Sequence, residues 1–140
     1  MVGTDGDDYI SVLGGANSVE GGAGNDTIAF LTGRISTIDG STGVDTLILG
    51  HRGTGSWTFN ASGPVVTDSR GNQISGFDNY SLGGSYLTDR LKTGAGNDIL
   101  HGNFGDDTLN GGAGTETLFG DQGNDLSRST QSYARNLTGR

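Results

Sequence analysis

A nine-residue repeat constrains this chain more than any other feature of its sequence. From Thr93 to Arg128 the chain divides into four contiguous nonapeptides, TGAGNDILH, GNFGDDTLN, GGAGTETLF and GDQGNDLSR. The phase extends backwards to GSYLTDRLK, and residues 3–29 carry three further units, GTDGDDYIS, VLGGANSVE and GGAGNDTIA. After one extra residue, Phe30, the window 31–39 is degenerate, and GSTGVDTLI restores the pattern at 40–48. Repetition at a short fixed period is typical of solenoids, in which each unit packs against its neighbours.

Two positions of the unit carry most of the signal. The eighth position is apolar in every readable unit except the last, where Ser127 occupies it, and the fourth position is mostly Gly. Each unit is therefore a Gly-rich acidic turn followed by a short segment with one apolar side chain. The sixth position is acidic or an amide throughout: Asp8, Asn17, Asp26, Asp45, Asp89, Asp98, Asp107, Glu116 and Asp125.

The spacing excludes helices and favours short strands. Apolar residues nine apart do not form a stripe with a helical period, and the Gly residues between them destabilise a helix. One inward side chain per unit, flanked by Thr, Tyr and Ile, is typical of a strand. Two consecutive units would make one coil with strands on opposite faces. Stacked coils predict an all-β fold of two parallel sheets about one thin core.

The composition narrows the possible functions. The chain has 140 residues, of which 28 are Gly and none is Cys, and it carries 16 acidic and eight basic residues. So acidic a protein is unsuited to bind nucleic acid, which is itself negatively charged. A chain without Cys forms no disulfide and no thiolate metal site. The longest apolar run is too short to span a bilayer, and the N-terminus lacks a signal-peptide pattern. A divalent cation would neutralise the carboxylates and replace part of the missing core.

The units resemble the nonapeptide GGxGxDxUx of the RTX calcium-binding proteins, in which U is a large apolar residue. The resemblance covers residues 3–48 and 84–128 in nine readable copies. Ordinary turn chemistry also favours Asp and Gly, but it does not explain nine copies in phase. The resemblance implies a right-handed parallel β-roll, a β-helix-like solenoid with two units in each coil, that binds several Ca²⁺ ions, about three to five.

Calcium takes about six to eight oxygen ligands, which a Gly-rich acidic turn can supply. Gly allows positive φ and inward carbonyls, and Asp adds a charged oxygen. In the family, one turn gives the carbonyls of positions two and four and its Asp. The turn one coil further on gives the carbonyls of positions one and three and its own Asp. The resemblance therefore implies sites between turns that are two repeat units apart.

In the N-terminal array the second implied site requires Phe30 to bulge out, and Asn17 faces the degenerate window and is not expected to bind an ion. The implied sites are Thr4, Gly6 and Asp8 with Gly21, Ala23 and Asp26, and then Gly22, Gly24 and Asp26 with Gly40, Thr42 and Asp45.

In the C-terminal array one half of the first implied site, Ser85 and Leu87, departs from the Gly pattern, and Glu116 is one methylene longer than Asp. The implied sites are Asp89 with Gly102, Phe104 and Asp107; Gly94, Gly96 and Asp98 with Gly111, Ala113 and Glu116; and Asn103, Gly105 and Asp107 with Gly120, Gln122 and Asp125.

Residues 49–83 interrupt the repeat and form an irregular, hairpin-like β insertion in the predicted fold. SWTFN (56–60), PVVT (64–67) and NQISGF (72–77) are typical of short strands separated by turns. The tail, 129–140, has lost the repeat and is expected to cap the last coil or to be disordered. The apolar residues of the insertion are expected to form a small core over the solenoid: Trp57, Phe59, Val65, Ile74 and Phe77.

A second feature of this region allows another partner. Arg34, Arg52 and Arg70 are separated by two repeat lengths each, so they would stack on one face if the coil persisted through the interruption. Such a basic ladder could bind an anionic polysaccharide, and a sugar could stack on Trp57, Tyr80 or Tyr86. The alternatives are exposed arginines at a chance spacing and aromatic side chains that belong to the core.

No catalytic motif of the HExxH, GxSxG or GxxxxGK[ST] type occurs, and His51 and His101 are isolated. We therefore expect a non-catalytic, monomeric calcium-binding module of a larger bacterial protein. The resemblance implies type I secretion of an unfolded chain and folding outside the cell, as a secreted or cell-surface protein. The alternative function is a polysaccharide-binding module, similar to those of alginate epimerases or surface adhesins.

Overall fold

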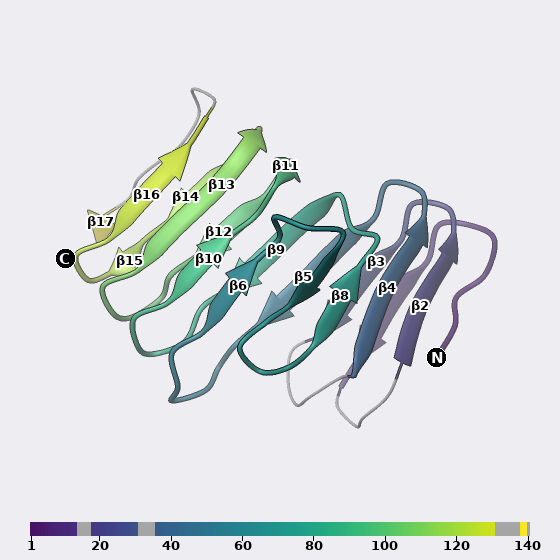
Figure 1. Cartoon of the computed structure of the whole chain (residues 1–140), viewed down its shortest axis with the longest axis horizontal. Coiled ribbons are helices and arrows are strands. Elements are labelled where there is room, and N and C mark those ends of the chain that lie inside the picture. The colour runs from purple at the N-terminus through teal and green to yellow at the C-terminus, as the bar shows by residue number, and fades with distance from the viewer. Residues whose placement is uncertain (14–17, 31–35, 131–137, 140) are drawn as a thin grey trace.

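The chain folds into two layers of short strands stacked along one long axis (Figure 1). The computed structural model describes residues 1–13, 18–30, 36–130 and 138–139, and no helix occurs among them. The N- and C-terminal ends lie at opposite ends of the stack (Figure 1). The predicted all-β solenoid of parallel coils is confirmed, with about six turns.

Sheet 1, the continuous layer, contains six parallel strands. It takes one strand from each coil, and it passes through the interruption because β5 pairs directly with β9. In spatial order its strands are β1 (Tyr9–Val12), β3 (Thr27–Phe30), β5 (Thr46–Gly50), β9 (Asn79–Gly83), β12 (Ile99–His101) and β14 (Thr117–Phe119).

Sheet 2, the opposite layer, is divided into two groups of strands. The first group is parallel apart from its last strand, which runs antiparallel to its neighbour. It contains β2 (Ser18–Ala23), β4 (Thr37–Thr42), β8 (Gln73–Ser75) and β7 (Val65–Thr67). The second group is parallel and contains β6 (Thr58–Asn60), β10 (Arg90–Lys92), β11 (Ala95–Gly96), β13 (Thr108–Gly114) and β16 (Leu126–Ser129). A separate pair, β15 (Asp121–Gln122) and β17 (Thr138–Gly139), lies near the C-terminal end.

The core between the sheets is one side chain deep from each layer. Because side chains alternate along a strand, each short strand sends mainly its central apolar residue inward. The position-eight residues fill this core as the repeat predicts, with Ile28, Leu47, Leu100, Leu109 and Leu118 fully buried. So thin a core buries little apolar surface per residue, and the turns must contribute to holding the coils together.

The interruption enlarges one coil. Leu47 pairs with Tyr80, 33 residues further on, and Ile38 pairs with Ile74, 36 residues further on, whereas the regular step is 18 residues. The three expected short strands form as β6, β7 and β8. Both β6 and β8 join sheet 2, whereas sheet 1 gains one strand over the same stretch.

Two details of the sequence prediction are wrong. Phe30 does not bulge out, since it lies in β3, is fully buried and pairs with Leu49. β1 pairs with β3 at the regular two-unit step, whereas β2 with β4 and β3 with β5 pair one position beyond it. The extra residue is therefore absorbed between Phe30 and Thr37. In β7 the alternation has the opposite phase, because Val66 is buried and Val65 is 59% exposed.

The enlarged coil contains its own buried ion pair. The Asp68 carboxylate is 3% exposed and accepts hydrogen bonds from Trp57 Nε1 at 3.0 Å and Arg70 Nε at 3.1 Å. Asn72 and the Arg70 backbone donate three more, at 2.9–3.0 Å. The Arg70 guanidinium lies 4.9 Å from the centre of the Trp57 ring. The network satisfies a buried carboxylate with a cation from the chain itself.

We expect Arg70→Met to destabilise the folded protein by about 3 kcal/mol, because Asp68 would keep a buried charge without its cation. Arg52→Met removes an equal charge from an exposed side chain, so it should change the free energy of unfolding by less than about 0.5 kcal/mol. Urea unfolding of both variants measures the difference. Equal effects would show that the buried pair does not stabilise this coil.

Candidate metal centres

The acidic turns lie along two edges of the rod. The first turn edge leads into the strands of sheet 1, and the second turn edge leads into the strands of sheet 2. Parallel pairing brings each turn next to the turn of the following coil, as the repeat predicts. The first turn edge carries Asp8, Asp26, Asp45, Asp78, Asp98 and Glu116, and the second carries Asp89, Asp107 and Asp125.

Most of the described turns share a backbone conformation with positive φ at fixed positions. At position four of the described turns φ is positive at six glycines, among them Gly43 and Gly105, a conformation that side chains disfavour. At position two φ is positive in five of the described turns, and there Asn and Asp tolerate the left-handed region. The position-two residues with positive φ are Gly22, Ser41, Asn103, Gly112 and Asp121.

The position-six carboxylates are joined to one another through the backbone. The Asp8 N–H donates to Asp26 Oδ1 at 2.8 Å, and the Asp107 N–H donates to Asp125 Oδ1 at 2.9 Å. The same contact joins Asp26 to Asp45 at 2.8 Å and Asp89 to Asp107 at 2.7 Å. Each carboxylate therefore lies against the turn of the preceding coil.

The second oxygen of most of these carboxylates is buried without a partner. An unpaired buried carboxylate oxygen is costly, because its negative charge loses water and gains no donor. Among the described residues, the buried carboxylate oxygens that accept no hydrogen bond are Oδ2 of Asp26, Asp45, Asp98, Asp107 and Asp125, and both oxygens of Glu116.

At Gly21 and Gly102, both at position one, an unpaired carboxylate oxygen faces a carbonyl of the next turn. A Cβ added at Gly102 would collide with Asp107 Oδ2 and would lie 2.6 Å from the Gly120 carbonyl oxygen. A Cβ added at Gly21 would collide with Asp26 Oδ2 and would lie 2.5 Å from a carbonyl oxygen one coil further on. Gly at position one therefore keeps open a small space between turns that is lined by carboxylate and carbonyl oxygens.

Two turns are closed by their own hydrogen bonds. Asp8 Oδ2 accepts from the N–H of Thr4 at 2.6 Å and from its hydroxyl at 2.9 Å. Asp89 accepts from the N–H of Ser85 at 2.5 Å and from its hydroxyl at 2.8 Å. Neither turn has the positive φ values of the others. These turns begin the two arrays, and they satisfy their acids without a further ligand.

Burial controls the protonation of the open turns. Desolvation raises the pKa of Glu116 from 4.5 to about 7, and the nearby Asp98 charge raises it further. Desolvation likewise raises the pKa of Asp107 from 3.8 to about 6, with a contribution from the charges of Asp89 and Asp125. Both groups therefore favour a proton or another cation over the bare charge.

We expect the calcium-free chain to gain stability as the pH falls from about 7.5 to about 4.5. The folded pKa values of Asp107 and Glu116 are raised above the unfolded values, so the folded chain binds protons more tightly. The stabilisation is complete below the unfolded pKa values and is lost as the pH rises through the folded ones. Far-UV circular dichroism of metal-free protein across this range measures the folded fraction. Asp107→Asn combined with Glu116→Gln should flatten the profile, and a folded fraction that rises with pH would contradict this coupling.

A second line of contacts runs along the turns at position five, and sequence reasoning missed it. The Asn25 N–H donates to Asp7 Oδ1 at 2.7 Å, and the Asn124 N–H donates to Asp106 Oδ1 at 2.8 Å. These bonds run from the later coil to the earlier one, opposite to those at position six. The signal for them was the frequent Asp or Asn at position five, which resembled ordinary turn composition.

The three arginines do not form a regular ladder in the described residues. Arg34 lies outside them, Arg52 is exposed, and the Arg70 side chain is 14% exposed in its pair with Asp68. Paired strands are separated here by much more than one regular coil, so the step of two repeat lengths from Arg52 to Arg70 is not one coil. Binding of an anionic polysaccharide by these residues stays a prediction.

Of the three aromatic residues considered for a sugar, Trp57 is fully buried and Tyr80 is 7% exposed, whereas Tyr86 is 55% exposed beside Phe104. Trp57 and Tyr80 therefore belong to the core. His101 is partly exposed and stacks on Phe119 with ring centres 4.5 Å apart.

The donor set between open turns fits a hard cation. No group of three or more His, Asp or Glu side chains in the described part of the chain could hold a metal ion alone, so the carbonyls must contribute. Carboxylates with backbone carbonyls are the ligands that calcium prefers, and calcium tolerates irregular geometry. The unpaired oxygens and the space between turns satisfy this requirement.

The fold and these turns define a β-solenoid with cation-binding turns. The family model of the RTX calcium-binding nonapeptide repeat (4 copies) matches residues 2–34, 83–115 and 92–126. The chain belongs to this family, whose repeat is a non-catalytic calcium-binding module typical of exported bacterial proteins. A search of curated proteins found no match. In the described residues no helix is long and apolar enough to cross a membrane.

Proposed function

We propose that this chain is a calcium-binding β-roll module that folds when calcium bridges the turns of successive coils. The observation that carries the proposal is the set of buried carboxylate oxygens without partners in the open turns. A folded chain at neutral pH without a cation would retain these desolvated charges, which oppose the small gain from its thin core.

We call the space between the turns of two successive coils a gap, and we call a turn open where its acid has a buried oxygen without a partner. The open turns indicate which gaps hold an ion. In three of the proposed gaps the earlier acid has a buried oxygen without a hydrogen-bond partner: Asp26 to Asp45, Asp98 to Glu116, and Asp107 to Asp125. In the two other gaps, Asp8 to Asp26 and Asp89 to Asp107, the earlier acid is closed by its own turn. We propose that the first three gaps bind calcium more tightly than these two.

The bound ion would supply positive charge and a shared coordination centre for two turns. Asp26, Asp98 and Asp107 would each offer the oxygen that has no partner. The turns would offer carbonyls already fixed by positive φ, as at Gly43 and Gly105. In the folded chain the hydrogen bonds at positions five and six set the spacing of neighbouring turns, so the oxygens of both turns would be held at the ion once the coils stack.

We further propose that the module belongs to a larger exported protein and folds outside the cell. The typical occurrence of RTX repeats in exported bacterial proteins supports this proposal. Residues 1–126 hold 16 acids and five bases, and this excess of negative charge would keep the chain unfolded where calcium is scarce. Folding by extracellular calcium would then follow passage of the unfolded chain.

We expect the chain to be largely unfolded in chelator at neutral pH and to fold in millimolar calcium. A site whose dissociation constant is tenfold below the free calcium concentration adds about 1.4 kcal/mol, so several sites reach a typical domain stability. Far-UV circular dichroism in chelator and then in calcium measures the transition. Magnesium should substitute poorly, because it requires a stricter octahedron and retains its waters. An unchanged β spectrum in chelator would refute calcium-dependent folding.

We expect Asp107→Asn to lower the stability in calcium by about 2–4 kcal/mol, on the scale of losing a buried charged ligand. Its carboxylate lies between two gaps, since it accepts the Asp89 N–H and aims Oδ2 at the following turn. The matched control is Asp106→Asn, which removes an exposed charge but keeps the oxygen that accepts the Asn124 N–H. That control should change stability by less than about 0.5 kcal/mol. Thermal melts and calorimetric ion counts compare the two, and equal effects would show that the assigned register is wrong.

A further inference from the structure

One acidic turn lies outside the repeat but in line with it. The turn from Gly76 to Asp78 joins β8 to β9, and neither residue falls within the residues that match the family. It is three residues shorter than the turn from Gly21 to Asp26. Thr46 nevertheless pairs with Asn79 as it pairs with Thr27 on its other side, so Asp78 occupies the place of a position-six acid.

Asp78 continues the carboxylate contacts of the first turn edge. The Asp45 N–H donates to Asp78 Oδ2 at 3.0 Å, the same contact by which the Asp26 N–H donates to Asp45 Oδ1 at 2.8 Å. In the next coil the pattern shifts, because Asp98 Oδ1 accepts from Tyr80 N, two residues beyond Asp78. The contacts from Asp8 therefore end at Asp78.

The gap between these turns contains an unpaired oxygen that the five gaps above leave unexplained. Asp45 is fully buried, and its Oδ2 accepts no hydrogen bond. A Cβ added at Gly40 would lie 2.9 Å from Asp45 Oδ2 and would collide with the Gly76 carbonyl oxygen. The same pair of atoms, a carboxylate Oδ2 and the carbonyl of the next turn, surrounds Gly21 in the gap before.

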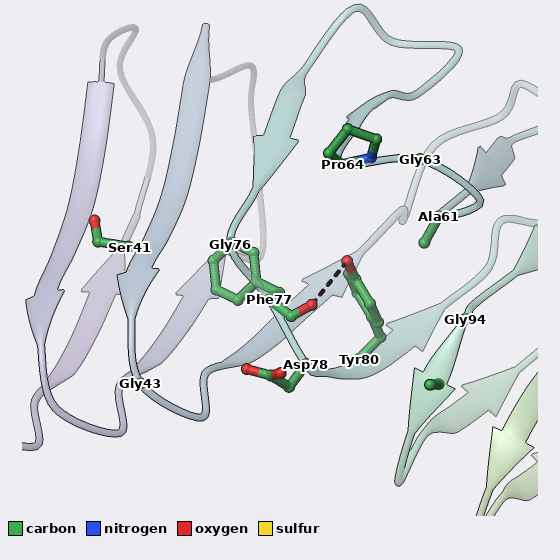
Figure 2. Close-up of a pocket in the computed structure, with 11 residues that line it drawn as sticks. Ser41, Gly43, Ala61, Gly63, Pro64, Gly76, Phe77, Asp78, Tyr80 and Gly94 are labelled. Atoms are coloured by element: carbon green, nitrogen blue, oxygen red, sulfur yellow. Dashed lines mark hydrogen bonds between the residues drawn. The ribbon is translucent and has the colours of Figure 1, made fainter.

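The short turn itself borders an open space. A cavity of about 400 Å³ lies at this turn, lined by Ser41, Gly43, Gly76, Phe77, Asp78 and Tyr80 among others. Figure 2 shows the Asp78 carboxylate close to Phe77 and Tyr80, with Ser41 and Gly43 on the preceding coil. A full turn would place three more residues in this region. Waters can occupy their place, and calcium accepts waters among its ligands.

The local charge favours a cation beside this turn. The carboxylates of Asp26, Asp78 and Asp39 lie near the buried Asp45 carboxylate. The preceding turn has positive φ at Ser41 and Gly43, as the other open turns do. Its carbonyls are thus fixed in the conformation that the proposed calcium sites share.

We propose that Asp45 and Asp78, with the Gly76 carbonyl and the carbonyls of the preceding turn, bind a further calcium ion. The site joins the N-terminal repeats to the enlarged coil. It rests on the proposed function, because it uses the same kind of oxygen set. It differs in its short second turn and its open cavity, so more water completes its coordination and its affinity is lower than that of the regular gaps.

The test is a calorimetric count of calcium ions on the full chain. Asp78→Asn keeps an oxygen that can accept the Asp45 N–H but loses the charge, so it should bind one ion fewer than the parent or bind one ion at least tenfold more weakly. Asp106→Asn removes the same charge from an exposed turn and should match the parent. Asp78→Glu retains the charge and should retain the ion count, with one site weakened by the longer side chain.

The outcomes separate the two proposals. A parent chain that binds no calcium overturns the proposed function and this site with it. A parent that binds calcium while Asp78→Asn keeps its count and affinities overturns this site alone. If Asp78→Asn does not fold in saturating calcium, Asp78→Glu decides: one weakened site supports the proposal, and unchanged affinities overturn it.

Discussion

The burial of stacked carboxylates is the constraint on which this structure depends. The thin core uses about one apolar residue per strand, and the contacts between coils therefore lie largely in the turns. There, an acid such as Asp107 uses one oxygen to accept an N–H from its neighbour and leaves the other buried beside a carbonyl. The geometry brings negative charges together and withholds donors from them. Cations between the coils, as proposed above, would complete a fold of this kind.

The enlarged coil also buries a carboxylate, but it satisfies that carboxylate with donors from the chain itself. Asp68 is as deeply buried as the acids of the open turns, but the chain supplies its donors from Trp57, Arg70 and Asn72. Aromatic packing replaces the turn contacts, since Trp57, Phe59 and Tyr80 form successive edge contacts with ring centres 5.5–5.6 Å apart. The proposed ions in the arrays and the side-chain packing between the arrays would thus be two sources of stability along one rod.

The sequence predicted those features of the fold that depend on its nine-residue period. A nine-residue spacing of apolar and acidic residues predicted the strands, the two sheets, the buried Leu and Ile residues and the stacking of acids such as Asp89 and Asp107, because stacking neighbours must share the same period. It failed where the period is broken. Phe30 was assigned to a bulge because the extra residue appeared beside it, whereas its bulk favours the core. Val66 and Val65 compete for one inward place in a strand too short to show its phase. Asp78 was missed because its turn is three residues shorter than the motif, and only the pairing of Thr46 with Asn79 reveals its place.

The self-contained ion pair of the enlarged coil bears on how such a rod can assemble. In a linear stack every coil contacts only its neighbours. Formation of the first coil is therefore the unfavourable step, and each further coil adds to an existing edge at a lower cost in free energy. A coil that satisfies Asp68 with Arg70 needs no ion to take its shape. It offers a ready template edge to the chain on both sides. Nucleation near the middle of the sequence would then let the stack grow at both ends at once. Each added coil would close a loop of one coil length, and short loops close at the least entropic cost.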